Sequence, residues 1–369
     1  MSSIPFIEAR VFDPEETQIA LERRLSEHLR RMRAHDLPFA GSENAADDDG
    51  DDLGLEFDAS EMVTLGEKDR RRIRRRVERL LERRKAASGL AHLKREERER
   101  LEGLRGGAQL IAIPSEHRAD ELAAALHDDM RWMASATEVV WHAMRRPVRE
   151  GWPGLRLPPL LLDGPSGIGK SHWARRLGEL LSAPVSVIEA TGENASFGVV
   201  GSQRGWGGAC PGRLIETVLQ TGIANPVIIV DEVEKAGQAV STKGQAFGLA
   251  EALLPLLEPM TARRWSCPYY QVKFDMGWVG WVLTSNNWHL LPEPLLSRCP
   301  PLRLRELTSA ELAGFIRREG MKRDLSEAAM DAILWALAHA SSHGHRPSLR
   351  VASRLLQRAV ELELAPVRH

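Results

Sequence analysis

GPSGIGKS, at residues 164–171, fits every fixed position of the phosphate-binding pattern G-x-x-x-x-G-K-[ST]. The apolar run at 160–162 precedes it as a short buried strand would, and a helical pattern with one apolar face follows. Glycines in such a loop let backbone N–H groups turn toward an anion at a helix N-terminus, where the helix dipole favours phosphate. The order of strand, glycine-rich loop and helix therefore predicts a nucleotide-phosphate site.

Side chains of this loop have separate expected roles. Lys170 is expected to reach the β- and γ-phosphates of ATP, and the Ser171 hydroxyl is expected to hold Mg²⁺. The residues predicted to contact the nucleotide are Gly164, Pro165, Ser166, Gly167, Ile168, Gly169, Lys170, Ser171 and His172.

A second apolar run, at 227–230, ends in Asp231 and Glu232. Phosphate-loop ATPases need a carboxylate for Mg²⁺ at such a strand end. A second carboxylate there can polarise the attacking water as a general base. We predict that Asp231 is a magnesium ligand, usually through water, and that Glu232 is the general base.

Three further polar residues extend the predicted site. The apolar run at 278–283 leads to Asn286, whose amide is expected to orient the water and sense the γ-phosphate, with Asn287 or a plain turn asparagine as alternatives. Arg298 is expected to stabilise charge on the transferred phosphoryl group across a subunit boundary. Arg350, or Arg346 just before it, is expected to reach back to the nucleotide.

Composition excludes several other classes of protein. The formal net charge of the 369-residue chain is -1, so no global field favours nucleic acid or a membrane. Three scattered cysteines form no C-x-x-C pair, which argues against a disulfide framework and a zinc site. The N-terminus lacks a signal-peptide pattern, and no run of 18 apolar residues occurs. We therefore expect a cytoplasmic protein without membrane contact.

Residues 67–105 are dominated by charge, with arginine at six of the seven positions from 70 to 76. A narrow apolar stripe predicts a long helix or a helical hairpin broken near residues 88–89. The arginines could grip nucleic-acid phosphates, but interleaved glutamates and the lack of aromatic residues favour a solvated, salt-bridged helix. The acidic run at 47–52 is expected to be a solvated linker, with a metal site as the alternative.

The chain order predicts four segments. They are an N-terminal segment with the acidic linker at 1–60, a charged helical arm at 61–115, an α/β nucleotide-binding domain at 116–306 and a helical lid at 307–369. The expected fold class is α/β, with a parallel sheet sandwiched by helices and a small all-helical domain after it.

These residues resemble an AAA+ ATPase, and more narrowly the ATPase module of Lon-type proteases. The similarity runs from about residue 160 to 318 and more weakly to 362. Beyond the Walker A loop, it rests on GWGGACPGRLI at 205–215, NPV at 225–227, the Walker B segment DEVEK at 231–235 and PEPLLSR at 292–298. The resemblance implies an AAA+ phosphate-loop fold and ATP hydrolysis in a hexameric ring with ATP at the subunit boundaries.

The resemblance also implies residue roles: Asn286 as sensor 1, Arg298 as arginine finger and Arg350 as sensor 2. The glycine-rich segment 198–208 resembles a substrate-gripping pore loop, with Trp206 where the family carries an aromatic residue. A flat apolar side chain on a glycine-rich loop can grip any polypeptide, whereas a buried tryptophan is the alternative. Residues 265–275 are expected to form a hairpin near sensor 1 that also faces the pore.

Two departures from the Lon pattern shape the expected function. The chain ends after the lid, so we expect no Ser-Lys protease domain, and the N-terminal substrate domain of Lon is not recognisable. The leading prediction is a homo-oligomeric ATP-hydrolysing motor that remodels a protein substrate, with a separate protease or effector as partner. The alternative is a nucleotide-gated scaffold or nucleic-acid-associated ATPase using the arginine-rich arm. A third hypothesis is a family member that does not hydrolyse ATP, and the presence of all the predicted catalytic residues argues against it.

Overall fold

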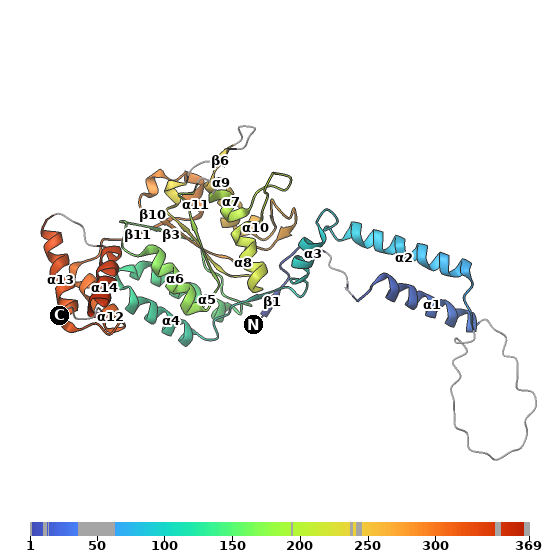
Figure 1. Ribbon diagram of the computed structural model, residues 1–369, viewed down its shortest axis with the longest axis horizontal. Coiled ribbons are helices and arrows are strands. Elements are labelled where there is room, and N and C mark those ends of the chain that lie inside the picture. The colour runs from blue at the N-terminus through green and yellow to red at the C-terminus, as the bar shows by residue number, and fades with distance from the viewer. Residues whose placement is uncertain are drawn as a thin grey trace, which may run out of the picture. The chain divides into compact units, whose positions relative to one another are not determined.

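In the computed structural model, the described residues are 2–9, 13, 15–35, 63–192, 195–236, 239–240, 246–343 and 348–364. They belong to two compact units, one made of residues 1–8 and 99–369 and the other of residues 9–98. Figure 1 shows the elements of both units, which are described separately below. The predicted linker run at 47–52 lies outside the described residues.

A five-stranded parallel sheet forms the centre of the larger unit, among the described residues. Its order is β11-β3-β10-β5-β4, where the strands are β3 (Leu160–Asp163), β4 (Val185–Glu189), β5 (Val227–Asp231), β10 (Gly280–Ser285) and β11 (Pro301–Arg303). The middle strands are continuous apolar runs because helices cover both of their faces. The predicted α/β class is confirmed. The carboxyl ends of β3, β5 and β10 meet at one edge, so the loops after them are neighbours.

Helices on one face of the sheet share a core with alternate strand residues such as Leu162, Ile229 and Val282. They are α4 (Glu116–Asp129), α5 (Ala134–Glu150) and α6 (Lys170–Leu181). On the other side lie α7 (Ala195–Val200), α9 (Leu249–Leu257) and α11 (Glu293–Arg298), as Figure 1 shows. The unit also contains α8 (Arg213–Thr221), α10 (Pro259–Ala262) and the short 3-10 turns η1 (Arg131–Met133), η2 (Val233–Lys235) and η3 (Trp288–Leu290).

Short strands join the N-terminus to this unit. β1 (Ser2–Ile4) pairs antiparallel with β2 (Ala108–Leu110), and Ile7 bridges to Phe274 of β9 (Lys273–Phe274). β9 pairs in turn with β8 (Trp265–Ser266), so the expected 265–275 hairpin is present; a second pair is β6 (Ala239–Val240) with β7 (Ala246–Phe247). Buried leucines at 101, 104 and 110 extend the unit back to residue 99, earlier than the expected boundary near 116.

The C-terminal part of the unit is helical, as expected for the lid. It consists of α12 (Ser309–Met321), α13 (Glu327–Ser342) and α14 (Leu349–Glu363). Thr308 and Glu311 form a capping box at the start of α12: the Thr308 hydroxyl accepts from the Glu311 N–H, and the Glu311 carboxylate accepts from the Thr308 N–H. Arg305 and these capping bonds hold the pKa of Glu311 down to about 2. The capping box fixes the direction in which α12 leaves the sheet.

The smaller unit is a helical pair. α1 (Gln18–His35) packs on α2 (Glu67–Ala87) through Leu21, Ile73 and Val77, and α3 (Arg95–Glu102) follows at the end of the unit. The predicted break near 88–89 is confirmed, because α2 ends at Ala87 and Gly89 has a φ of 73°. Within the described residues, no helix is both long and apolar enough to cross a membrane.

Candidate nucleotide site

The phosphate loop joins β3 to α6 in a shape that only glycine tolerates at two positions. Gly167 and Gly169 have φ of 80° and 94°, in the left-handed region. A Cβ on Gly167 would lie 2.6 Å from the Cβ of Ser348, and one on Gly169 would lie 2.7 Å from side-chain atoms of Leu349 and Met130. The glycines therefore permit both the turn and the close approach of the lid helix α14.

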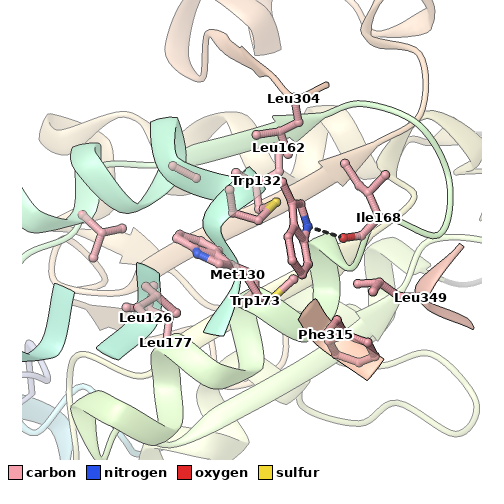
Figure 2. Close-up of a cluster of buried hydrophobic side chains, with 14 of the residues drawn as sticks. Leu126, Met130, Trp132, Leu162, Ile168, Trp173, Leu177, Leu304, Phe315 and Leu349 are labelled. Carbon is pink, nitrogen blue, oxygen red and sulfur yellow. Dashed lines mark hydrogen bonds between the residues drawn. The ribbon is translucent and has the colours of Figure 1, made fainter. Parts of the chain in front are cut away.

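The loop rests on a hydrophobic cluster that includes the lid (Figure 2). The Trp132 indole donates a hydrogen bond of 2.8 Å to the Ile168 carbonyl, and Phe315 of α12 packs edge-on against Trp132 with ring centroids 6.5 Å apart. The Leu349 N–H donates to the Gly167 carbonyl at 2.9 Å. Because loop and lid share one core, a movement of the lid must change the environment of the loop.

Lys170 lies at the first position of α6 and is only 7% exposed. Its ammonium donates to the carbonyls of Gly164 (2.6 Å) and Pro165 (3.0 Å) and to the side-chain oxygen of Asn286 (2.9 Å). Burial lowers the pKa of Lys170, and the nearby carboxylates oppose that shift. The predicted loop lysine and the predicted strand-tip asparagine therefore meet directly.

Ser171 and Asp231 also meet as predicted. The Ser171 hydroxyl donates to an Asp231 carboxylate oxygen at 2.7 Å, and the Thr284 hydroxyl donates to the same oxygen at 2.5 Å. Adjacent hydroxyl and carboxylate oxygens are the hard ligands that Mg²⁺ prefers, and Mg²⁺ typically uses one or two carboxylates plus substrate phosphates. The site fits that ion, and the described residues contain no cluster of three or more His, Cys, Asp or Glu that could hold a metal by itself.

Glu232 is the first residue after β5, in a left-handed conformation with φ 54° and ψ 49°. Its carboxylate accepts hydrogen bonds from the Lys235 ammonium at 2.8 Å and from the Asn286 amide at 3.2 Å. Lys235 first, and Asn286 after it, lower the pKa of Glu232, while burial opposes them. The carboxylate is therefore ionised and held in place.

Sequence reasoning missed three residues around Glu232. Thr284 accepts a hydrogen bond from the Glu232 N–H at 3.0 Å, Glu234 accepts from both the N–H and the amide of Asn286, and Lys235 pairs with Glu232. Thr284 could have been found as the first polar residue after the apolar run of β10. Glu234 and Lys235 stood in the quoted DEVEK segment but had been given no role.

A cavity of about 500 Å³ lies between these groups and the lid. Lys170, Ser171, Asp231, Glu232 and Asn286 line one side, and α14 contributes positions 350, 353, 354 and 357, which share one helix face. Arg350 therefore lies where the prediction placed it, whereas Arg346 is outside the described residues. Arg354, one turn later, and Arg175 of α6 were not predicted. His172 also lines the cavity.

Comparison with known proteins adds a decisive match. A sequence model of the family described as "ATPase family associated with various cellular activities (AAA)" matches residues 160–306. Residues 160–306 form an AAA ATPase domain. This domain binds nucleotide, and its matched range includes the phosphate loop, Asp231, Glu232 and Asn286.

The chain is also similar to Lon proteases. Lon protease 2 of Thermus thermophilus is 33% identical over 170 residues, which is 46% of this chain and 20% of that protein. The Lon protease of Desulfovibrio desulfuricans is 31% identical over 180 residues, or 49% and 20% of the two chains. The peroxisomal Lon protease homolog 2 of Spinacia oleracea is 33% identical over 166 residues, or 45% and 18%. The matched region thus spans about a fifth of each relative, as the resemblance to the ATPase module implied.

Arg298 of the AAA domain does not line the cavity of its own chain. It ends α11, donates to the Pro294 carbonyl at 2.9 Å, and has its Nε 3.6 Å from a carboxylate oxygen of Glu258. The structure therefore does not bring Arg298 together with the other predicted catalytic residues within one chain.

Trp206 of the AAA domain lies in a loop closed by a bridge between Gly201 and Pro211. It is half-buried and packs edge-on against Phe197, with ring centroids 5.5 Å apart. Gly205 and Gly208 flank it with positive φ, and added Cβ atoms there would meet nothing within 4 Å. The loop is thus glycine-rich and uncrowded, and its tryptophan is not a fully buried core residue.

Proposed function

We propose that this chain is an ATP-hydrolysing motor that assembles into a ring, with six subunits, and remodels protein substrates. The observation that supports hydrolysis best is the convergence of Lys170, Ser171, Asp231, Glu232 and Asn286 on one cavity. A binding loop alone would explain retention of ATP. The ionised carboxylate of Glu232, held beside the loop by Asn286, adds a base for water.

Each residue has a task in the proposed reaction. Loop N–H groups and Lys170 bind and orient the β- and γ-phosphates, and Ser171 with Asp231 would hold Mg²⁺. That ion, when bound, neutralises phosphate charge. Glu232 accepts the proton of the attacking water. The Asn286 amide holds the Glu232 carboxylate in the orientation that this step needs. Arg350 and Arg354 place positive charge from the lid in the same cavity.

Lys235→Ala is expected to move the acid limb of the rate–pH profile to higher pH. Lys235 is the largest cause of the lowered pKa of Glu232, so its removal lets that pKa rise. A base with a higher pKa stays protonated, and therefore inactive, up to a higher pH. Steady-state ATP hydrolysis measured from pH 7 down to below 4.5, the ordinary pKa of a glutamate, tests this. Lys322→Ala, which removes a similar surface pair with Glu319, is the control. Identical acid limbs in the two variants would contradict the role of Lys235.

The ring is supported by the position of Arg298. An arginine finger stabilises charge on the transferred phosphoryl group, and in one chain Arg298 is absent from the cavity lining. A neighbouring subunit can supply it, which makes the site complete only in the oligomer. Trp206, on its glycine-rich loop, is proposed to grip the substrate polypeptide, and the similar relatives are named proteases. Cleavage is proposed to belong to a separate protease or effector.

Specific activity of the purified chain is expected to rise with protein concentration, because dilution separates subunits. Arg298→Ala is expected to lower turnover by about a thousandfold, within the range for a finger arginine. Arg118→Ala, which removes an exposed arginine paired with Glu121, is expected to behave like the wild type. Activity that is independent of protein concentration and survives in Arg298→Ala would contradict both the arginine-finger role of Arg298 and the ring assembly.

A further inference from the structure

Five arginines and one lysine of α2 form a continuous exposed stripe on one face of the helix. The arginine stripe consists of Lys68, Arg72, Arg75, Arg76, Arg79 and Arg83, and all six are exposed. At about 100° per residue they occupy roughly 100° of the helix circumference, and they extend over about 22 Å along its axis. No acidic residue of α2 lies within that sector. We propose that this stripe binds the phosphate backbone of double-stranded nucleic acid.

The stripe is distinct from the arginines that hold the arm together. Arg33 of α1 binds both carboxylate oxygens of Asp69 on α2. Arg84 of α2 lies 2.6 Å from Glu16, in the segment before α1. These pairs join α2 to α1 and to that segment. Within the described residues, the stripe side chains make no hydrogen bond or salt bridge. Arg72 contributes to the lowered pKa of Asp69, but the oxygens of that carboxylate are already bonded to Arg33. Among the described residues, therefore, no acidic group occupies the stripe, and its charges can bind an external anion.

Helix phase separates this surface from the acids that the sequence interleaves with it. Glu78 and Glu82 lie about 110° and 70° around the helix from the centre of the stripe, at about 100° per residue. Ile73 and Val77 lie on the far side, buried against α1. The expected salt bridges of α2 form at Arg71, Arg74 and Arg84, whereas the stripe face carries like charges with no acidic residue of α2 among them.

The chemistry of the stripe favours a duplex backbone over other polyanions. A membrane-surface helix needs an exposed apolar face, whereas the apolar face of α2 packs on α1. Single strands are gripped by base stacking on aromatic rings, and residues 15–35 and 63–98 contain no aromatic side chain apart from histidine. Guanidinium groups match phosphate oxygens in a bidentate manner, and regularly spaced phosphates match a regularly spaced stripe. Binding without base contacts should be independent of sequence.

The test uses the full chain and a fluorescently labelled 20-base-pair DNA duplex of random sequence. Anisotropy gives the affinity between 50 and 200 mM salt. The triple variant Arg72→Gln/Arg76→Gln/Arg79→Gln is expected to bind about tenfold or more weakly. The slope of log affinity against log salt should become shallower by about 3, roughly one for each lost phosphate contact. An RNA duplex should behave like the DNA duplex, and the matching single strand should bind more weakly.

The control has the same change in net charge. Arg71→Gln/Arg118→Gln/Arg146→Gln removes three exposed arginines, each of which is paired with a glutamate outside the stripe. It should keep the affinity within about twofold of the wild type and the full salt slope. Circular dichroism and ATP hydrolysis, unchanged in both variants, would show that the fold is retained. Equal losses in the two variants, or no duplex binding by the wild type at 50 mM salt, would overturn the proposal.

Discussion

Glu232→Gln is expected to retain bound ATP but to slow its hydrolysis by about a hundredfold or more, the range for loss of a general base. Glutamine preserves the size of the side chain and can still contact the Asn286 amide, but it cannot take a proton from water. ATP affinity should change little, because the loop N–H groups, Lys170 and Ser171 remain. Single-turnover release of phosphate from prebound ATP measures the chemical step directly.

The control for this change is Glu179→Gln. Glu179 lies on α6 of the same domain, and its carboxylate pairs with Arg176 away from the cavity. Its turnover should equal that of the wild type. If Glu232→Gln kept the wild-type rate, the base would have to be another carboxylate. Glu234 would then be the first to test, since it is bonded to the same asparagine.

The site was largely predictable because its residues sit where short motifs meet strand ends. An apolar run followed by a polar residue reveals the carboxyl end of a buried strand, and parallel strands bring those ends to one edge. Lys170, Asp231 and Asn286 were placed by this argument. The strand order was not predictable, since each strand reads as a similar apolar run.

Other features depend on contacts that leave no local pattern. β1 and β2 are three residues long and lie more than one hundred positions apart in the sequence, so neither shows a strand period. Helical spacing continues through residues 117–146, but the chain breaks at Met130, whose φ of -146° and ψ of 71° are not helical. Arg354 joins the cavity only because α14 turns the face of Arg350 toward the loop.

Lys170→Ala is expected to weaken ATP binding by about 10- to 150-fold, the equivalent of a charge-assisted hydrogen bond of roughly 1.5–3 kcal/mol. The ammonium supplies the positive charge closest to the loop, and alanine replaces it with a methyl group. Titration of a fluorescent ATP analogue measures the affinity. Lys322→Ala, on the lid surface, is the matched lysine control and should bind as the wild type does.

The same substitution should also act on the chain without nucleotide. Lys170 joins the Gly164 and Pro165 carbonyls to Asn286, so its loss leaves three acceptors without that donor. A lower melting temperature without ATP would therefore accompany the weaker binding. The loss of stability and the loss of ATP affinity must then be measured separately. The difference in melting temperature with and without saturating ATP isolates the binding term, because a ligand stabilises only through its affinity for the folded state. Unchanged ATP affinity in a variant that melts earlier would assign Lys170 to loop structure alone, and the phosphate role would have to be withdrawn.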